Sequence, residues 1–335
     1  MAFRAARDVC RRYGKNFYFA SAFLPRGKRD AAHAVFAFCR MIREAIDAPG
    51  DAQDDAGASA LRHRPLSATG GGACCSSHPL DQRVALLRER LDELYAGTLE
   101  LPAASSRSVP HHILHAFGLA ARRYQIPRQH FVDIAEGVRR DLLVRRYATW
   151  ASLERHCRQS AGAAASALAC VLGVTNSDAT EHAVTLGAAV ALTRLLKGVK
   201  HDCAGGRIYL PLEDLAAFRY SERDLAEGVV DDRFRRLMRF QVARARRLYR
   251  EAAEGLCWVA GDGSRLAAAT IIALSSGTLD AIERQGYDVF RRPPELLGAR
   301  KFGRLPLAWR LARRRPNAPL PAFLPMKTAH VRAAR

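Results

Sequence analysis

The chain has 335 residues, of which 49% are hydrophobic and 26% charged, and this composition excludes a wholly disordered or fibrous protein. Its 53 lysines and arginines outnumber its 33 aspartates and glutamates, which gives a formal net charge of +20. The N-terminal residues carry charges where a signal peptide needs an apolar run, and no long uninterrupted apolar stretch follows. We therefore expect a globular cytoplasmic protein without a membrane-spanning segment.

Apolar residues recur with helical periodicity along the whole chain, and the sequence contains no convincing series of alternating strand residues. Residues 48–80, rich in Ala, Gly, Ser and Pro, are predicted to form a long loop. Helical patterning resumes after every break, so we predict an all-α fold with one domain over residues 1–290. The predicted helices lie near residues 27–47, 81–96, 110–124, 128–144, 151–173, 179–202, 231–260 and 263–285.

Residues 291–335 form a basic C-terminal segment with twelve lysines and arginines and one acidic residue, Glu295. Such a cluster attracts nucleic acid, anionic lipid or a phosphorylated ligand through the same Coulombic force. A solvated tail without a ligand is the remaining alternative. No nucleic-acid-binding signature accompanies the charges, so we expect no specific nucleic acid ligand, and we expect any membrane contact to be peripheral.

Residues 16–40 (NFYFASAFLPRGKRDAAHAVFAFCR) closely resemble the opening of squalene and phytoene synthases. The blocks 137–149 (GVRRDLLVRRYAT), 157–162 (CRQSAG), 186–211 (LGAAVALTRLLKGVKHDCAGGRIYLP) and 287–290 (YDVF) match in the same order. The resemblance covers about residues 13–290. It implies the all-α isoprenoid synthase fold, a helical bundle around a central cavity, and transfer of a prenyl group between two prenyl diphosphates in isoprenoid biosynthesis.

The resemblance also implies Mg²⁺, which aspartates on two facing helices hold in this family. Expelling a diphosphate requires positive charge, and the carbocation left behind requires a dry apolar cavity. Carboxylates suit the metal because hard Mg²⁺ prefers oxygen ligands, and an i, i+4 spacing aligns them on one face of a helix.

This sequence departs from the family pattern at those acidic positions. Where the family has Asp-Asp-x-x-Asp, the chain has Arg43, Glu44 and, at the last position, Asp47. In the second motif the chain reads ALTRLLKGVKHD over residues 191–202, and Asp202 is the acidic ligand that persists. Because basic or neutral residues replace several carboxylates, the Mg²⁺ site is expected to be weakened or lost.

The resemblance and its departures together give three groups of candidate residues. The metal candidates are Glu44, Asp47 and Asp202. Two tyrosines at family-like positions, Tyr147 and Tyr249, are candidates for stabilising a carbocation through their ring faces. The candidates for binding diphosphate are Arg40, Arg43, Arg194, Lys197, Lys200 and Arg207.

Three interpretations of the basic substitutions stay open at this point. In the first, fixed cations hold a prenyl diphosphate or a related anionic isoprenoid in place of the metal, since arginine suits bidentate phosphate contacts. In the second, the protein is catalytically inactive and serves as an anion- or partner-binding assembly factor, as the superfamily includes assembly proteins. In the third, the basic residues only form a solvated helix face.

Overall fold

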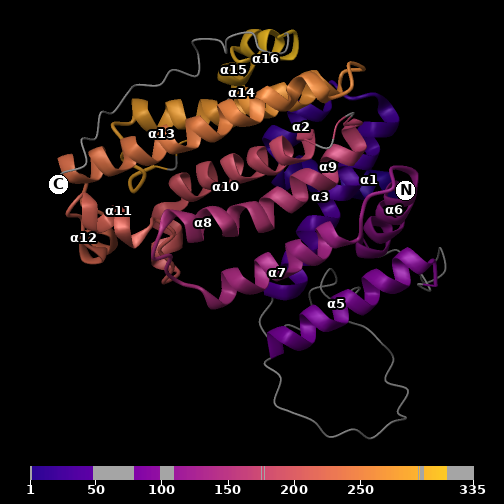
Figure 1. Cartoon of the computed structure of the whole chain (residues 1–335), viewed down its shortest axis with the longest axis horizontal. Helices are drawn as coiled ribbons and strands as arrows, with labels where there is room; N and C mark the ends of the chain where they lie inside the picture. The colour runs from indigo at the N-terminus through magenta and orange to yellow at the C-terminus, as the bar shows by residue number, and fades with distance from the viewer. Residues whose placement is uncertain are drawn as a thin grey trace, which may run out of the picture. The chain divides into compact units, whose positions relative to one another are not determined.

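The structure is a computed structural model that describes residues 2–47, 79–98, 109–174, 176, 178–292, 294 and 298–314. Their regular structure is helical (Figure 1), and within these ranges the only extended pairings are two isolated bridges, Arg146 with Ile208 and Val174 with Val259. The predicted all-α fold is confirmed. Most of the predicted loop over 48–80 lies outside the described residues, although its last two residues begin a helix.

The contacts divide the chain into two compact units, and each is described by itself. Unit 1 comprises residues 1–18 and 26–143. Its helices are α1 (Ala2–Tyr13), α3 (Arg26–Asp47), α5 (Pro79–Ala96), α6 (Val109–Arg123) and α7 (Gln129–Leu143). Helix α3 lies at the centre and packs against each of the other four. The core of the unit contains Phe38 and Phe117, whose rings stack with centroids 3.8 Å apart, and Phe131, whose ring meets both edge to face.

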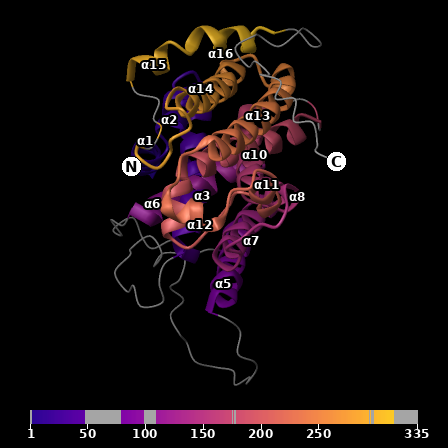
Figure 2. The same cartoon turned by 90° about the vertical axis from the view of Figure 1, so that its left-hand side faces the viewer.

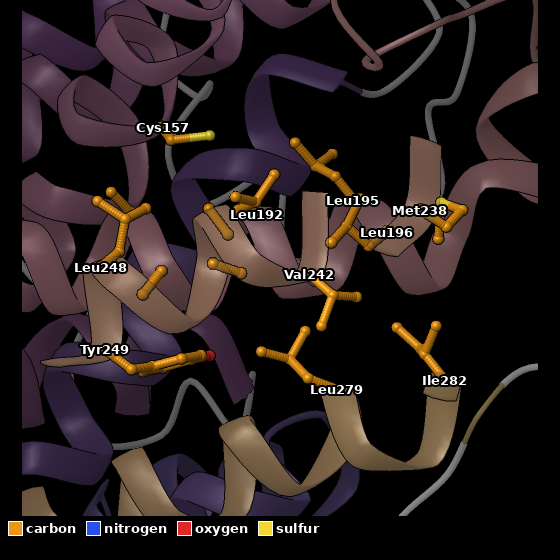
Figure 3. Packing of buried hydrophobic residues seen from close by; sticks show 14 of the residues in the cluster. Cys157, Leu192, Leu195, Leu196, Met238, Val242, Leu248, Tyr249, Leu279 and Ile282 are labelled. Atoms are coloured by element: carbon orange, nitrogen blue, oxygen red, sulfur yellow. The ribbon is translucent and has the colours of Figure 1, made fainter. Parts of the chain in front are cut away.

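Unit 2 comprises residues 19–25 and 144–335, and α2 (Lys15–Ser21) runs from unit 1 into its first segment. The long helix α10 (Asp178–Ala204) packs against α13 (Asp232–Glu254) and α14 (Ser264–Arg284). Figure 3 shows side chains of these three helices meeting in the apolar core of the unit. The other elements are α8 (Trp150–Cys157), a π-helical turn (Arg158–Gly162), α9 (Ala163–Leu172), α11 (Leu212–Ala217), α12 (Glu222–Glu227), a 3₁₀ turn (Gly255–Trp258), α15 (Gly298–Phe302) and α16 (Leu305–Ala312).

The position of α10 depends on a close backbone contact with the π-helical turn. A Cβ atom on Gly187 would lie 2.3 Å from the carbonyl oxygen of Ala161 and 2.7 Å from the Cα of Gly162. On the other side of the contact, a Cβ on Gly162 would lie 2.8 Å from Val184. Glycine is needed at both positions because only a residue without a side chain allows the two backbones to approach this closely.

Each of the eight predicted helices is present, with ends that differ by a few residues from those predicted. The predicted helix over 151–173 is interrupted by the π-helical turn, and the one over 231–260 ends in the 3₁₀ turn. The short or strongly polar helices α1, α2, α11, α12, α15 and α16 were not predicted. A single domain over 1–290 stays a prediction, and part of the basic segment, α16, packs on α14 in unit 2 (Figure 2).

By length and composition, α14 is apolar enough to cross a membrane, but 78% of its most apolar window is buried inside the protein. Its neighbours α10, α13 and α16 supply this burial. A helix that is apolar on nearly all sides is expected wherever other helices surround it, so packing within unit 2 accounts for the hydropathy of α14.

Candidate functional site

The C-terminal half of α3 carries four of the candidate residues on one side of the helix. Arg40, Arg43, Glu44 and Asp47 follow an i, i+3, i+4, i+7 spacing, which places them on one face. The intervening residues Met41, Ile42, Ala45 and Ile46 are buried in unit 1. Amphipathicity therefore turns the four polar side chains away from the core.

Arg40 is engaged by two neighbours within unit 1. Its guanidinium lies 2.6 Å from the Glu44 carboxylate, one helical turn later, and its Cζ lies 3.4 Å from the centroid of the Tyr13 ring. The tyrosine face attracts the cation, and the carboxylate fixes its orientation. Glu44 is thus an ion-pair partner of Arg40, and Asp47 is exposed at the end of α3.

Arg43 reaches a carboxylate on a different helix of unit 1. Its guanidinium lies 3.6 Å from Asp141 of α7, whose side chain is only 8% exposed. Burying a carboxylate is costly unless a cation or hydrogen-bond donors compensate it. The arginine at the first position of the altered acidic motif therefore provides positive charge beside a buried aspartate.

The second altered motif lies in the C-terminal half of α10, in unit 2. Arg194 and Lys200 are exposed and Lys197 is half-buried. The 3.6-residue period places all three along one side of the helix. The intervening Leu195, Leu196 and Val199 are buried in the core of the unit. This part of α10 therefore presents a basic stripe outside and an apolar face inside.

Asp202 is the last residue of the motif, and its side chain lies along α10, beside Gly198 one turn earlier. A Cβ atom on Gly198 would lie 3.1 Å from the Asp202 Oδ2, so the carboxylate occupies space beside the glycine that a longer residue would fill. The side chain of Asp202 is 17% exposed. His201 is 96% exposed, with its Nδ1 3.9 Å from the same carboxylate. Gly198 therefore leaves room along the helix for the Asp202 carboxylate.

A small hollow in unit 2 lies beside Asp202. It has a volume of ≈ 10 Å³, about the space of one water molecule, and Asp202, Arg207 and Tyr209 line it together with apolar residues. The backbone N–H of Arg207 donates to the carbonyl of Asp202 at 2.8 Å, which fixes the turn that follows α10. The structure thus brings two candidates, Asp202 and Arg207, to the lining of one small and mainly apolar hollow.

The two candidate tyrosines occupy different surroundings in unit 2. Tyr147 is 4% exposed, and its ring stacks on Tyr209 with centroids 5.8 Å apart. Tyr249 of α13 is fully buried, and its hydroxyl lies 2.9 Å from the hydroxyl of Thr193 on α10. Burial raises the pKa of Tyr249 well above its ordinary value, so this phenol stays protonated. It ties α13 to the apolar face of α10.

Asp141 was missed among the candidates, although the sequence contains a signal for it. Phe131, Ile134, Ala135 and Val138 form the buried stripe of α7, and Asp141 continues the same helical register. A carboxylate in an apolar register requires a compensating charge. The sequence therefore indicates that Asp141 needs a compensating cation, and the structure shows that Arg43 is one.

The whole-chain comparisons identify the family. A family model described as squalene/phytoene synthase matches residues 10–300. The chain belongs to the squalene/phytoene synthase family. It is 34% identical over 319 residues to a 15-cis-phytoene synthase of Synechococcus elongatus, with 92% of each chain covered. It is 33% identical to a phytoene synthase of Arthrospira platensis, covering 93% of this chain and 94% of that one.

Solved structures show that the fold is also that of the squalene/phytoene synthase family. A dehydrosqualene synthase solved in complex with a ligand matches with a TM-score of 0.74 and 24% identity, over 92% of this chain and 95% of that one. A squalene synthase from Alicyclobacillus acidocaldarius matches with a TM-score of 0.67 and 23% identity, over 86% and 95% of the two chains. The predicted family and its all-α isoprenoid synthase fold are both confirmed.

Taken by itself, neither altered motif supplies three acidic side chains for Mg²⁺: the first has Glu44 and Asp47, and the second has Asp202. Glu44 is held by Arg40, and on α10 the space beside Gly198 is taken up by the Asp202 carboxylate. Within the described part of the chain, no three His, Cys, Asp or Glu side chains gather into a set that could hold a metal ion. Several oxygen ligands are normally needed to hold Mg²⁺, so we assign no chemical step to this ion.

Proposed function

We propose that this protein binds a prenyl diphosphate and that basic side chains supply positive charge where the family uses Mg²⁺. The 33–34% identity to phytoene synthases along more than nine-tenths of the chain supports a prenyl diphosphate as the ligand. The altered motifs support the change in how that ligand is held. The proposal concerns binding and assigns no ionisation step to the protein.

The basic stripe of α10 is the observation that carries the proposal. Among the described residues, neither Arg194 nor Lys200 takes part in an ion pair, and both are exposed. A diphosphate carries several negative charges, and a guanidinium can donate two parallel hydrogen bonds to phosphate oxygens. Arginine and lysine along one side of a helix therefore attract a diphosphate, whereas a row of carboxylates without a metal ion would repel it.

The residues of unit 1 make a different contribution to the proposal. Arg40 and Arg43 already lie beside Glu44 and Asp141, so a large part of their charge is neutralised within the unit. We therefore expect the α10 side chains to contribute more to diphosphate affinity than those of α3. In family members that bind it, Mg²⁺ neutralises charge on the bound diphosphate, and here Arg194 and Lys200 are proposed to supply that positive charge.

Thermal unfolding with a non-hydrolysable geranylgeranyl thiodiphosphate tests this proposal. We expect the ligand to raise the melting temperature in EDTA as much as in Mg²⁺, since a ligand that binds only the folded state stabilises it. If the protein were stabilised only when Mg²⁺ is present, the replacement of metal by side chains would be wrong. No stabilisation under either condition would favour the partner-binding assembly factor.

A matched pair of variants locates the binding charge. Arg194→Gln is expected to weaken binding about tenfold, because charge-assisted hydrogen bonds to phosphate are lost. Arg236→Gln, which changes another exposed arginine on α13 of the same unit, is the control and is expected to leave affinity unchanged. Equal effects of the two variants would indicate attraction by net charge alone.

A product assay separates binding from turnover. The protein is incubated with farnesyl or geranylgeranyl diphosphate and Mg²⁺, and hydrocarbon products are sought by mass spectrometry. A coupled C30 or C40 product would show that the altered motifs still support prenyl transfer. It would exclude the catalytically inactive alternative, whichever way the diphosphate is held.

A further inference from the structure

Residues 298–314 fold onto unit 2 and carry six basic residues and no acidic one. One face of α16 is buried through Leu307, Ala308 and Leu311, and the helix packs on α14. Figures 1 and 2 show α16 on the side of α14 that faces away from α10. We refer to the outer side of residues 298–314 as the C-terminal surface.

An ion-pair network beneath this surface holds it in place. Arg304, at the start of α16, pairs with Asp280 of α14. The buried Arg246 of α13 lies 2.7 Å from Asp280 and 2.6 Å from Glu283. The acidic groups of α14 that face this region are therefore occupied by Arg246 and Arg304. Because Asp280 and Glu283 are paired with these two arginines, they do not neutralise the basic residues on the outer side of α16.

The C-terminal surface also exposes large apolar side chains. The side chain of Phe302 is 61% exposed and that of Trp309 is 50% exposed. The Cζ of Arg313 lies 3.9 Å from the centroid of the Trp309 ring, and Arg310 is exposed next to it. Helical geometry places Trp309, Arg310 and Arg313 opposite the buried face of α16. Trp309 and the two arginines thus lie on the outward side of α16, while Phe302 of α15 is partly covered by Phe19, with ring centroids 5.3 Å apart.

We infer that the C-terminal surface docks on an anionic phospholipid bilayer. A helix that is buried on one side and exposes tryptophan and arginine on the other can lie flat in the interface, with the ring at headgroup depth. The basic residues attract the negative headgroups. Binding to a nucleic acid would need only the basic residues, whereas a bilayer interface would also bury the exposed parts of Trp309 and Phe302. The inference is independent of whether the protein binds a diphosphate.

Vesicle co-sedimentation of the full-length protein tests the inference. We expect binding to phosphatidylcholine vesicles that contain phosphatidylglycerol, weak binding to phosphatidylcholine alone, and release of the protein by high salt. Equal binding to both kinds of vesicle, or no binding to either, would overturn the proposal. Preference for an RNA homopolymer over the anionic vesicles would overturn it in favour of nucleic acid.

Two sets of variants assign the binding to this surface. Phe302→Ser with Trp309→Ser, and separately Arg310→Gln with Arg313→Gln, are each expected to reduce partitioning about tenfold. Leu143→Ser is the matched control, because Leu143 is also 50% exposed but belongs to α7 of unit 1. Circular dichroism checks that each variant is folded. Unchanged partitioning of the folded aromatic variant would show that the C-terminal surface does not carry the contact.

Discussion

The basic residues of the two altered motifs differ in their surroundings: those of α3 lie beside carboxylates, and Arg194 and Lys200 of α10 are exposed. In unit 1, Arg40 and Arg43 each lie beside a carboxylate, Glu44 and Asp141. In unit 2, Arg194 and Lys200 face outward, and the Asp202 carboxylate is turned back over Gly198. In the sequence the two motifs look alike, because in both of them basic residues occur in a motif that is acidic in the family. In the structure, Arg43 lies beside a buried carboxylate, whereas Arg194 and Lys200 are exposed, which is why we propose a ligand for α10 and not for α3.

The largest expected effect concerns how α10 is held in place. Gly187→Ala inserts a methyl group 2.3 Å from the Ala161 carbonyl oxygen, where backbone has to move. We expect the free energy of unfolding to fall by about 3 kcal/mol, because overpacking against backbone cannot be relieved by a rotamer change. Urea unfolding followed by circular dichroism measures the loss.

Gly198→Ala is the control on the same helix. Its new Cβ would lie 3.1 Å from the side chain of Asp202, which can rotate away. Alanine also favours helix over glycine, by about 1 kcal/mol. We expect this variant to be as stable as the parent or slightly more so. If both variants were equally destabilised, close backbone packing would not be what positions α10.

The next effect concerns the response to acid of a buried histidine in unit 1. His33 of α3 is 1% exposed and stacks on Tyr18, with ring centroids 5.6 Å apart. Burial, together with the nearby Arg29 and Arg7, lowers the pKa of His33 to about 4. In the unfolded chain histidine titrates near pH 6.5, so between these values the unfolded state binds more protons. Stability therefore falls as the pH drops from 6.5 toward 4.

At pH 5 this residue alone is expected to cost about 2 kcal/mol relative to pH 7.5. His33→Gln should flatten the pH dependence by that amount, whatever its effect on stability at neutral pH. His115→Gln, which changes an exposed histidine of α6, should leave the pH dependence as it is. If the curve of His33→Gln paralleled that of the parent, His33 would not be the group responsible.

The sequence was sufficient for the fold, for reasons visible in individual helices. The apolar stripes of α3 and α7 and the length of α10 predict these elements directly, and the collinear motifs identify the family. The π-helical turn after α8 has no sequence signal of this kind, and its backbone lies in close contact with Gly187. The short helix α16 follows from burial on α14, a contact between residues far apart in the chain.

For the site, the sequence predicted which positions differ from the family but not what each side chain contacts. The i, i+4 spacing permits an ion pair of Arg40 with Glu44 and equally one of Arg43 with Asp47, but Arg43 lies beside Asp141, almost one hundred residues away. The rotation of Asp202 over Gly198 depends on side-chain conformation and not on spacing. Spacing therefore shows which local pairs are possible without deciding which one forms, and it does not indicate contacts between helices.

The smallest expected effect tests the comparison between α3 and α10 directly. Arg43→Gln removes the cation beside Asp141 and is expected to lower the free energy of unfolding by about 1 kcal/mol, less at high salt, because the arginine is partly exposed. Arg194→Gln, on α10, removes an exposed arginine and is expected to change stability by less than about 0.5 kcal/mol. Denaturant unfolding at two salt concentrations measures both. Equal losses would mean that the fold needs Arg194 as much as it needs Arg43. The assignment of the α10 charges to a ligand would then lose its support.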